Sequence, residues 1–281
     1  MTFNYIAAKK IFDCLSIIDA PLPKAIDIGV QTPSIRQDTI EKFINLKNLT
    51  KKQNFFYKEI IEKKNFSTKD FLLALGFDEY SSIDINGAEN SFQFDLNYDL
   101  QETYGFKEKY DLVVNNGTGE HVFNQYCLFK NIHQITNNNG LMLHILPFVD
   151  WINHGFYNFN PIFFADLASS NDYEIEDITL ANRNGAELSI KNKSSIKILF
   201  EQVKPNYESN FKTVLKKARS QLGENILIVV ILRKKTIKPF KVPLQGKYLQ
   251  DISLIDSEYS NQGSGSANAF GQEKDGIKRG K

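Results

Sequence analysis

Short apolar runs alternate with amphipathic stretches along the first two thirds of the chain, and this alternation predicts the order of its elements. Apolar runs at 24–30, 79–84, 111–114 and 141–146 predict buried strands, and a further short strand is expected at 91–94. Helix signals lie between them, in the stretches 67–76 and 122–135 and after Pro161, and the run NNNG at 137–140 predicts a turn. Strands and helices that alternate at this spacing predict a mainly parallel sheet with helices on both faces.

The pattern changes in three other parts of the chain. Residues 32–66 are polar and amphipathic, which predicts an inserted helical segment. Beyond Tyr173 the chain is more β-like, with candidate strands at 173–180, 187–190, 196–200 and 226–232 and a helix at 211–222. From residue 257 onward few apolar side chains remain, which predicts a disordered tail. We therefore expect one domain over residues 1–256, with an insertion at about 32–66, and a tail over 257–281.

Composition narrows the possible partners. A hydrophobic content of 42% over 281 residues is enough for a sizeable core. The 34 basic and 33 acidic side chains nearly cancel, so no strong field attracts a nucleic acid or an anionic membrane. Cys14 and Cys127 lack the spacing of a zinc site or a disulfide framework. No apolar run approaches the ~18 residues of a membrane span, and we expect a soluble, cytoplasmic protein.

The segment 110–125, with the sequence YDLVVNNGTGEHVFNQ, carries the most specific pattern in the chain. A short apolar strand runs into two asparagines, two glycines, an acid and a histidine, where a helical pattern begins. Ligands of open α/β sheets bind beyond the carboxyl ends of the strands. Gly117 and Gly119 permit close approach of the backbone, and Glu120 and His121 supply reactive groups. The segment therefore predicts the edge of a binding site.

Two further strands are followed by aspartates, Asp84 and Asp95. A carboxylate can accept hydrogen bonds from both hydroxyls of a ribose, which is the role that the position of Asp84 suggests. Asp95 could accept from an exocyclic amino group, while the backbone of Leu96 meets the ring. As a pair they suggest an adenosine-bearing ligand. The alternative is that both acids cap turns or the helices that follow.

With these residues the sequence resembles class I S-adenosylmethionine-dependent methyltransferases. Acids after the second and third strands match Asp84 and Asp95, and Asp111 opens the fourth strand. The segments GTGEHVFN at 117–124 and HGFYNFNP at 154–161 resemble more narrowly a bacterial subgroup linked to polysaccharide or small-molecule modification. The resemblance covers roughly residues 24–173, and PLQGKY at 243–248 is also similar to it.

The resemblance implies a Rossmann-like fold: a doubly wound, mainly parallel, seven-stranded methyltransferase sheet with helices on both faces. It implies S-adenosylmethionine as the cofactor. The positions matched to donor binding are Asp27, Gly29, Gln31, Asp84, Ile85, Asp95, Leu96, Asn116, Gly117 and Thr118. The chain departs from the family after the first strand, where the family carries Gly-X-Gly-X-Gly and this sequence has Gly29 alone.

Methyl transfer depends chiefly on alignment of the two reactants, but a hydroxyl acceptor also needs a base. His154, Tyr157 and His121 are the candidates for acceptor binding or proton removal, whereas His144 lies between apolar neighbours and is expected to be structural. Glu120 and His121 could ligate a cation, but no third ligand stands at a recognisable spacing, so no metal site is expected. Several aromatic residues between 148 and 164 form either an acceptor pocket or core packing.

The sequence thus favours a methyltransferase with a small-molecule, sugar, lipid-linked or other glycan-type acceptor, and makes no prediction of oligomeric state. One alternative is a non-catalytic binding or scaffolding protein that kept the fold and lost the donor loop, as the single Gly29 suggests. Another is a nicotinamide-dependent oxidoreductase. The Gly-X-Gly-X-X-Gly fingerprint is missing, and Asp84 lies much further than ~20 residues beyond Gly29, which counts against it.

Overall fold

A seven-stranded sheet forms the centre of the computed structural model, which describes residues 2–44, 49–62, 66–190 and 207–244. The strand order is β2-β1-β3-β4-β7-β5-β6. The strands are β1 (Lys24–Ile28), β2 (Glu79–Ile83), β3 (Tyr110–Asn116), β4 (Thr136–Val149), β5 (Tyr173–Ala181), β6 (Glu187–Ser189) and β7 (Ile226–Lys234).

The direction of the strands divides the sheet into two parts. β1 pairs in parallel with β2 and β3, and β3 pairs in parallel with β4. β7 then runs antiparallel between β4 and β5, and β6 pairs antiparallel with β5. The carboxyl ends of the four parallel strands therefore lie at one edge of the sheet.

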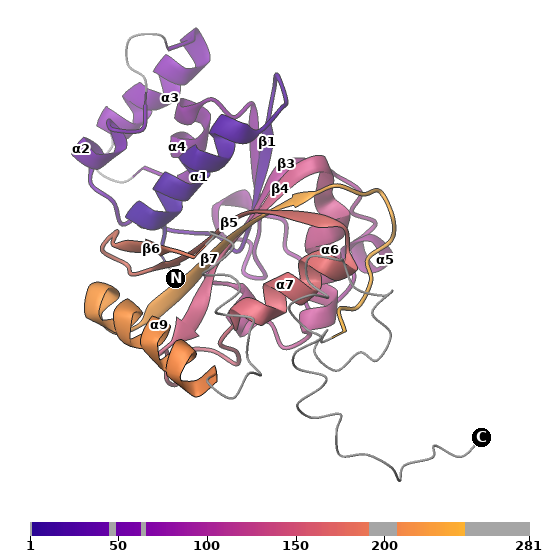
Figure 1. The fold of residues 1–281 in the computed structure, drawn as a ribbon. Helices are drawn as coiled ribbons and strands as arrows, with labels where there is room; N and C mark the ends of the chain where they lie inside the picture. Colours follow the sequence, from indigo (N-terminus) through magenta and orange to yellow (C-terminus); the bar gives the residue numbers. More distant parts are fainter. Residues whose placement is uncertain (1, 45–48, 63–65, 191–206, 245–281) are drawn as a thin grey trace.

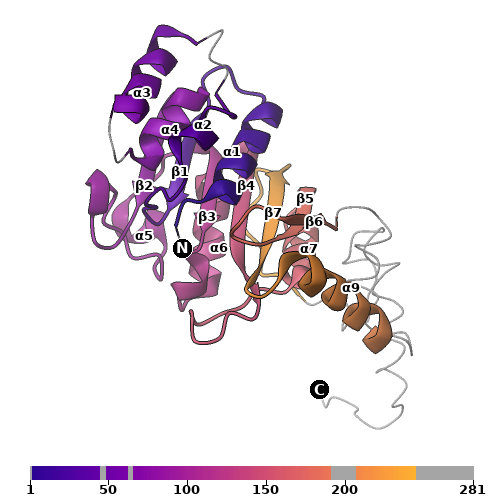
Figure 2. The same ribbon diagram turned by 90° about the vertical axis from the view of Figure 1, so that its left-hand side faces the viewer.

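Helices cover both faces of the sheet (Figures 1 and 2). They are α1 (Tyr5–Ile17), α2 (Gln37–Ile40), α3 (Lys51–Glu62), α4 (Thr68–Leu75), α5 (Leu100–Tyr104), α6 (Gln125–Ile135), α7 (Pro161–Ser170) and α9 (Tyr207–Leu222). Apolar residues of α1 to α4 share one core cluster, and those of α5, α6 and α7 share the other. The Rossmann-like, doubly wound α/β class expected from the sequence is confirmed.

The burial of strand β7 on both faces explains the continuous apolar run in this part of the sequence. Ile228 and Val230 join the core cluster of α6 and α7, while Leu227 and Val229 join the cluster of α1. Successive side chains of a strand point to opposite faces, so a strand covered on both faces needs apolar residues at every position. All four side chains are fully buried, and burial of one such side chain contributes about 1.5–3 kcal/mol.

Local signals in the sequence place several helix ends. Ser67 and Asp70 form the expected capping box at the start of α4, and Gly76, with φ 127°, ends it. Pro161 occupies the first turn of α7. Helix α6 begins later than its pattern suggests, because the Asn124 side chain accepts a hydrogen bond from the Cys127 N–H and caps the helix there.

Two local predictions are wrong. The strand expected at 91–94 is reduced to one bridge between Ile83 and Phe92, because the Phe94 N–H donates back to the Phe92 carbonyl and turns the chain. The turn expected at 137–140 lies inside β4. Asn139 adopts φ 62° there, and the pairing with β3 shifts register nearby, so the polar residues form an irregularity in the strand.

The remaining predictions of elements have mixed outcomes. The helical stretch 32–66 contains α2 and α3, and the strands and helix expected after Tyr173 match β5, β6, α9 and β7 within a few residues. The candidate strand at 196–200 and the tail at 257–281 lie outside the described residues. No described helix has both the length and the apolar content that a membrane span needs.

The two-sided burial of β7 generates a stability prediction. Ile228→Ala should lower the free energy of unfolding by about 2–5 kcal/mol, because the lost side chain leaves a cavity between two packed layers. Ile237→Ala is the matched control, since Ile237 is 87% exposed, and it should change stability by less than about 0.5 kcal/mol. Urea unfolding followed by circular dichroism measures both. Equal losses in the two variants would contradict the layer assignment.

Candidate functional site

The loop after β1 is held between the ends of β2 and β3. The Val30 N–H donates to Asp84 Oδ2 at 3.1 Å, which ties the loop to the end of β2. On the other side, a Cβ built on Gly29 would lie 2.2 Å from Thr118 Oγ1, and Gly29 has φ 92°. Only glycine fits both the backbone conformation and the contact. The edge at which the parallel strands end is therefore closely packed.

Asp84 lies half-buried at the end of β2. Oδ2 accepts from Val30, and Oδ1 accepts from the Asn86 N–H at 2.9 Å. Two carboxylate oxygens offer about four acceptor sites, so Asp84 can still accept from a ligand hydroxyl. Its neighbour Ile85 is exposed.

Asp95 is engaged mainly by its own turn. Its Oδ1 accepts from both the backbone N–H and the side-chain amide of Asn97, at 2.9 and 2.8 Å. Leu96 is buried in the core cluster of α6 and α7. The Asp84 N–H donates to the Phe92 carbonyl, so the segment that leads to Asp95 runs beside the end of β2.

Three of the predicted donor-binding side chains, those of Asp27, Gln31 and Asn116, are buried and have few hydrogen-bond partners. Asp27 Oδ2 accepts from the Tyr80 hydroxyl at 2.9 Å, and Gln31 Oε1 accepts from Asn116 Nδ2 at 3.4 Å. Asp27 Oδ1 and Asn116 Oδ1 have no hydrogen-bond partner among the described residues. Burial raises the pKa of Asp27 to about 7, although the Tyr80 hydrogen bond opposes the shift. Buried acceptors without donors are costly, and a ligand with N–H groups would satisfy them.

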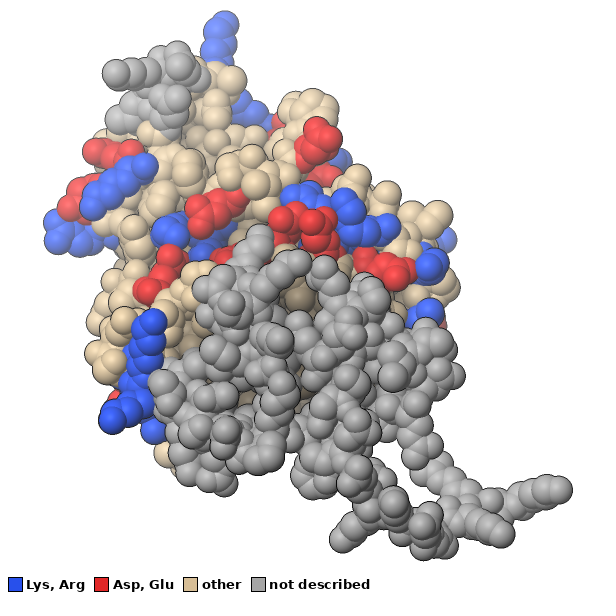
Figure 3. Space-filling view, viewed as in Figure 1, with Lys and Arg blue, Asp and Glu red and all other residues tan. Residues whose placement is uncertain are grey.

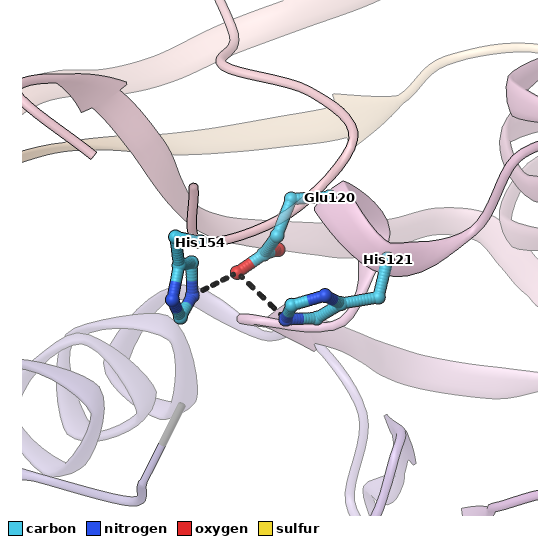
Figure 4. A group of neighbouring side chains, drawn as sticks. All are labelled: Glu120, His121 and His154. Carbon is cyan, nitrogen blue, oxygen red and sulfur yellow. Dashed lines mark ion pairs between the residues drawn. The ribbon is translucent and has the colours of Figure 1, made fainter. Parts of the chain in front are cut away.

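Glu120, His121 and His154 come together at the carboxyl edge and, among the described residues, form a group of three potential metal ligands (Figure 4). Glu120 Oε1 lies 3.4 Å from His154 Nε2 and 3.8 Å from His121 Nε2. Glu120 and His121 belong to the turn Gly119–His121 after β3, and His154 comes from the loop after β4. The sequence predicted both histidines as candidates, but gave no sign that the two loops bring them to one carboxylate.

Burial sets the charges in this cluster. The Glu120 side chain is fully buried, and burial raises its pKa to about 7. Burial also lowers the pKa of His121 and of His154, and the neighbouring His121 lowers that of His154 further. Both imidazoles are therefore neutral at neutral pH and keep a nitrogen lone pair.

Backbone hydrogen bonds hold the cluster in place. The Phe156 N–H donates to the Glu120 carbonyl at 2.8 Å, and the Gly119 N–H donates to Asn115 Oδ1 at 2.9 Å. A Cβ on Gly155 would lie 2.9 Å from the Glu120 carbonyl oxygen. The loop after β4 thus crosses directly over Glu120, which only a glycine permits.

The other two candidate side chains point elsewhere. The Tyr157 hydroxyl donates to the Phe123 carbonyl at 2.9 Å and takes no part in the cluster. His144 is buried in β4, where its Nδ1 lies 3.4 Å from Asn115 Nδ2, and burial lowers its pKa to about 3. Its place in the core agrees with the structural role expected from its apolar neighbours.

Two pockets are lined by described residues, and neither lining includes a member of the cluster. One, of about 400 Å³, is lined by Tyr157, Phe159 and Phe163 together with polar residues such as Gln125. Phe148, Trp151, Phe159 and Phe164 are buried, as expected for core packing. Tyr157, Phe159 and Phe163 line this pocket, and its use by an acceptor stays a prediction. The other, of about 450 Å³, lies where the chain start meets the loops around 35 and 183, and its lining includes Arg36 and Arg183.

Sequence reasoning missed Arg36 and Arg183, because each is an isolated cation in a polar stretch. The guanidinium of Arg183 lies 4.7 Å from the centroid of the Trp151 ring, which in turn lies 4.8 Å from the His154 ring. Only the folded chain reveals that the β5–β6 connection reaches the site. Acidic and basic side chains are interspersed over the described part of the face in Figure 3, in line with the small net charge.

No family model matches the sequence, and no curated protein matches it. Among solved structures, the chain is similar to an O-methyltransferase from a trans-AT PKS multienzyme of Brevibacillus brevis in complex with S-adenosyl-L-homocysteine. The two chains are 13% identical, the match covers 96% of this chain and 78% of that chain, and the TM-score is 0.41. It is also similar to TehB from Haemophilus influenzae, with 13% identity, coverage of 81% and 62%, and a TM-score of 0.42. A putative sarcosine dimethylglycine methyltransferase from Galdieria sulphuraria has 11% identity, coverage of 82% and 85%, and a TM-score of 0.41. These likenesses are distant and identify no function.

The raised pKa of Asp27 generates a pH prediction. The folded protein keeps this proton up to pH about 7, whereas the ordinary pKa of an aspartate side chain is 3.8. The folded state therefore holds more protons than the unfolded state between these values, and the free energy of unfolding should fall as pH rises through this window. Asp27→Asn should make this dependence of the free energy of unfolding on pH less steep by up to about 1.4 kcal/mol per pH unit, which is the contribution of one titrating proton. Urea unfolding across the window measures it, and an unchanged slope would contradict the assignment.

Proposed function

We propose that this chain is an S-adenosylmethionine-dependent methyltransferase with a small-molecule, sugar or lipid-linked acceptor. The observation that supports it best is the packing of the loop after β1 between Asp84 and Thr118. This packing gathers the motif residues that resemble a methyl-donor site at one edge of the sheet, where ligands of open α/β folds bind.

Each part of the donor has a chemical match at this edge. Asp84 keeps acceptor capacity for the ribose hydroxyls. Asp27 Oδ1 and Asn116 Oδ1 are buried acceptors without a described partner, and the ammonium group of the donor's methionine part supplies three N–H donors. In this proposal Ile85, Asp95 and Leu96 contact the adenine, and Gly29, Gln31, Gly117 and Thr118 contact the methionine part.

The acceptor would approach from the side of Glu120 and His154. The sulfonium of the donor is already activated, so the protein has to align the acceptor and remove its proton. His154 is the proposed base, because its neutral imidazole lies 3.4 Å from Glu120, which stabilises the imidazolium that forms. The aromatic pocket beside Tyr157 and Phe159 would hold the apolar part of the acceptor.

Two observations favour a second candidate, a non-catalytic binding protein with the same fold. Thr118 Oγ1 lies against Gly29, and both oxygens of Asp84 already accept backbone hydrogen bonds. If these contacts have only a structural role, the edge of the sheet is closed to the donor. Donor binding distinguishes the two candidates.

Calorimetry with S-adenosylmethionine and S-adenosylhomocysteine tests donor binding. Asp84→Asn should weaken both affinities by roughly tenfold or more, because a charged acceptor of the ribose hydroxyls contributes about 1.5–3 kcal/mol. Asp19→Asn, a change at an exposed acid before the amino end of β1, should leave both affinities unchanged, because the proposed donor site lies at the carboxyl end of that strand. Absence of binding to either ligand by the unaltered chain would reject the methyltransferase and favour the binding protein.

Methyl transfer is tested with a labelled donor and a cell extract, using mass spectrometry to find the labelled product. We expect a labelled small molecule, sugar or lipid. His154→Gln should lower turnover by about 100-fold or more, because it removes the base, while the donor affinity stays constant. A variant that loses donor affinity instead would contradict the role of His154 as a base.

A further inference from the structure

The cluster of Glu120, His121 and His154 has the composition of a metal site. We propose that these three side chains bind a divalent transition-metal ion of the zinc class. The sequence offered only the adjacent pair Glu120 and His121, and the fold adds His154 from a separate loop. The proposal goes beyond the methyltransferase and does not depend on it, because the ion would bind in the absence of any methyl donor. An ion bound at His154 Nε2 would use the lone pair of that nitrogen, so the metal-bound form would exclude His154 Nε2 as the base proposed above.

The distances between the three side chains suit one ion. One ligand atom from each side chain lies within 4.8 Å of the other two. Metal–ligand bonds of about 2.0–2.2 Å place two ligands of a tetrahedral ion about 3.3 Å apart. Glu120 Oε1 is 3.4 Å from His154 Nε2 and 3.8 Å from His121 Nε2, and the widest pair of ligand atoms would have to close by at most about 1.5 Å for one ion to bind all three.

A lack of other partners points to a missing ligand. Both carboxylate oxygens of Glu120 are buried and have no hydrogen-bond partner in the described part of the chain. His154 Nε2 is also buried and has no hydrogen-bond partner there. The Glu120 side chain is 0% exposed. A carboxylate buried in this way is costly unless a cation or a set of donors satisfies it. A divalent ion between these atoms would satisfy all of them at once.

The backbone holds the ligands near the geometry they need. The Phe156 N–H bonds to the Glu120 carbonyl and fixes the loop of His154 to the turn of Glu120. The His121 N–H donates to the Thr118 carbonyl at 2.9 Å and closes that turn. Because these contacts already fix the loops that carry the ligands, the loops lose little conformational entropy when the ion binds.

The donor set also selects the class of ion. Two imidazole nitrogens and one carboxylate suit zinc, iron(II), cobalt and nickel, whereas magnesium and calcium prefer oxygen ligands. Three protein ligands leave at least one position open for water or for an acceptor oxygen. Because His121 is 46% exposed, solvent reaches the cluster from this side.

The distribution of potential ligands makes the site easy to test. The chain has four histidines, and the other two have partners in the core. His133 Nδ1 lies 2.6 Å from the Tyr173 hydroxyl, and His144 is fully enclosed in β4. Of the two cysteines, Cys14 is buried, and Cys127 is partly accessible. Metal uptake should therefore depend on the cluster and not on these groups.

Zinc binding to the full chain is measured by calorimetry after removal of metal with a chelator and dialysis. We expect one Zn²⁺ per chain. Glu120→Gln and His154→Ala should each weaken binding by more than about tenfold, because even a partner in the outer shell of a metal site is worth this much. The controls are Glu108→Gln, at an exposed acid, and Cys127→Ser, and both should bind as the unaltered chain does.

Fluorescence locates the ion independently. The chain has one tryptophan, Trp151, and its ring centroid is 4.8 Å from that of His154. Paramagnetic Co²⁺ should therefore quench the emission of Trp151 in the unaltered chain and in both controls, but not in Glu120→Gln. Circular dichroism of each metal-free variant shows whether it is folded, and the isosteric Glu120→Gln change keeps the test valid if His154→Ala unfolds.

Each outcome decides the proposal. Stoichiometric Zn²⁺ binding that is lost in Glu120→Gln supports it. Absence of binding, or equal binding by the variant and the controls, would overturn it and leave a carboxylate–imidazole pair that only shares a proton. Mg²⁺ that binds as tightly as Zn²⁺ would overturn the assigned class of ion. Donor calorimetry is unaffected by any of these results, so this proposal and the methyltransferase can fail separately.

Discussion

The close approach of backbones at the carboxyl edge of the parallel strands is the constraint on which the site depends. Gly29 leaves room for Thr118, and Gly155 leaves room for the carbonyl of Glu120. Any larger residue at either position would collide with the neighbouring loop. The edge is thus built by four loops that contact one another, each set in place by a strand with helices on both sides.

This edge concentrates polar groups that the core alone would not tolerate. Asp27, Asn116 and Glu120 each bury oxygen atoms without a partner in the described residues. Such groups lower stability, and their cost is offset by the continuous apolar layers on both faces of β7 and its neighbours. In the two proposals made above, the methyl donor would supply partners for Asp27 and Asn116, and the metal ion would supply a partner for Glu120.

Much of the fold follows from local patterns. The capping box at Ser67 and the proline that opens α7 each carry enough information to place an element, because the interactions involved are local. The run at β7 is recognisable because burial on both faces requires an apolar residue at nearly every position. The expected strand at 91–94 failed because pairing is decided by the neighbours. Its residues have strand-like side chains, but a hydrogen bond from Phe94 back to Phe92 turns the chain after a single bridge.

The sequence by itself determined the α/β class, the strand predicted at 111–114, which the structure extends to Tyr110–Asn116, and the polar turn with Glu120 and His121 side by side. Only the tertiary structure decided that His154 completes that pair. The pairing of Asn116 with Ile145 sets the two strands in register, so their following loops meet above the same edge. Contacts between loops that are distant in sequence depend on this register and on glycine packing, and no local pattern of residues records either of them.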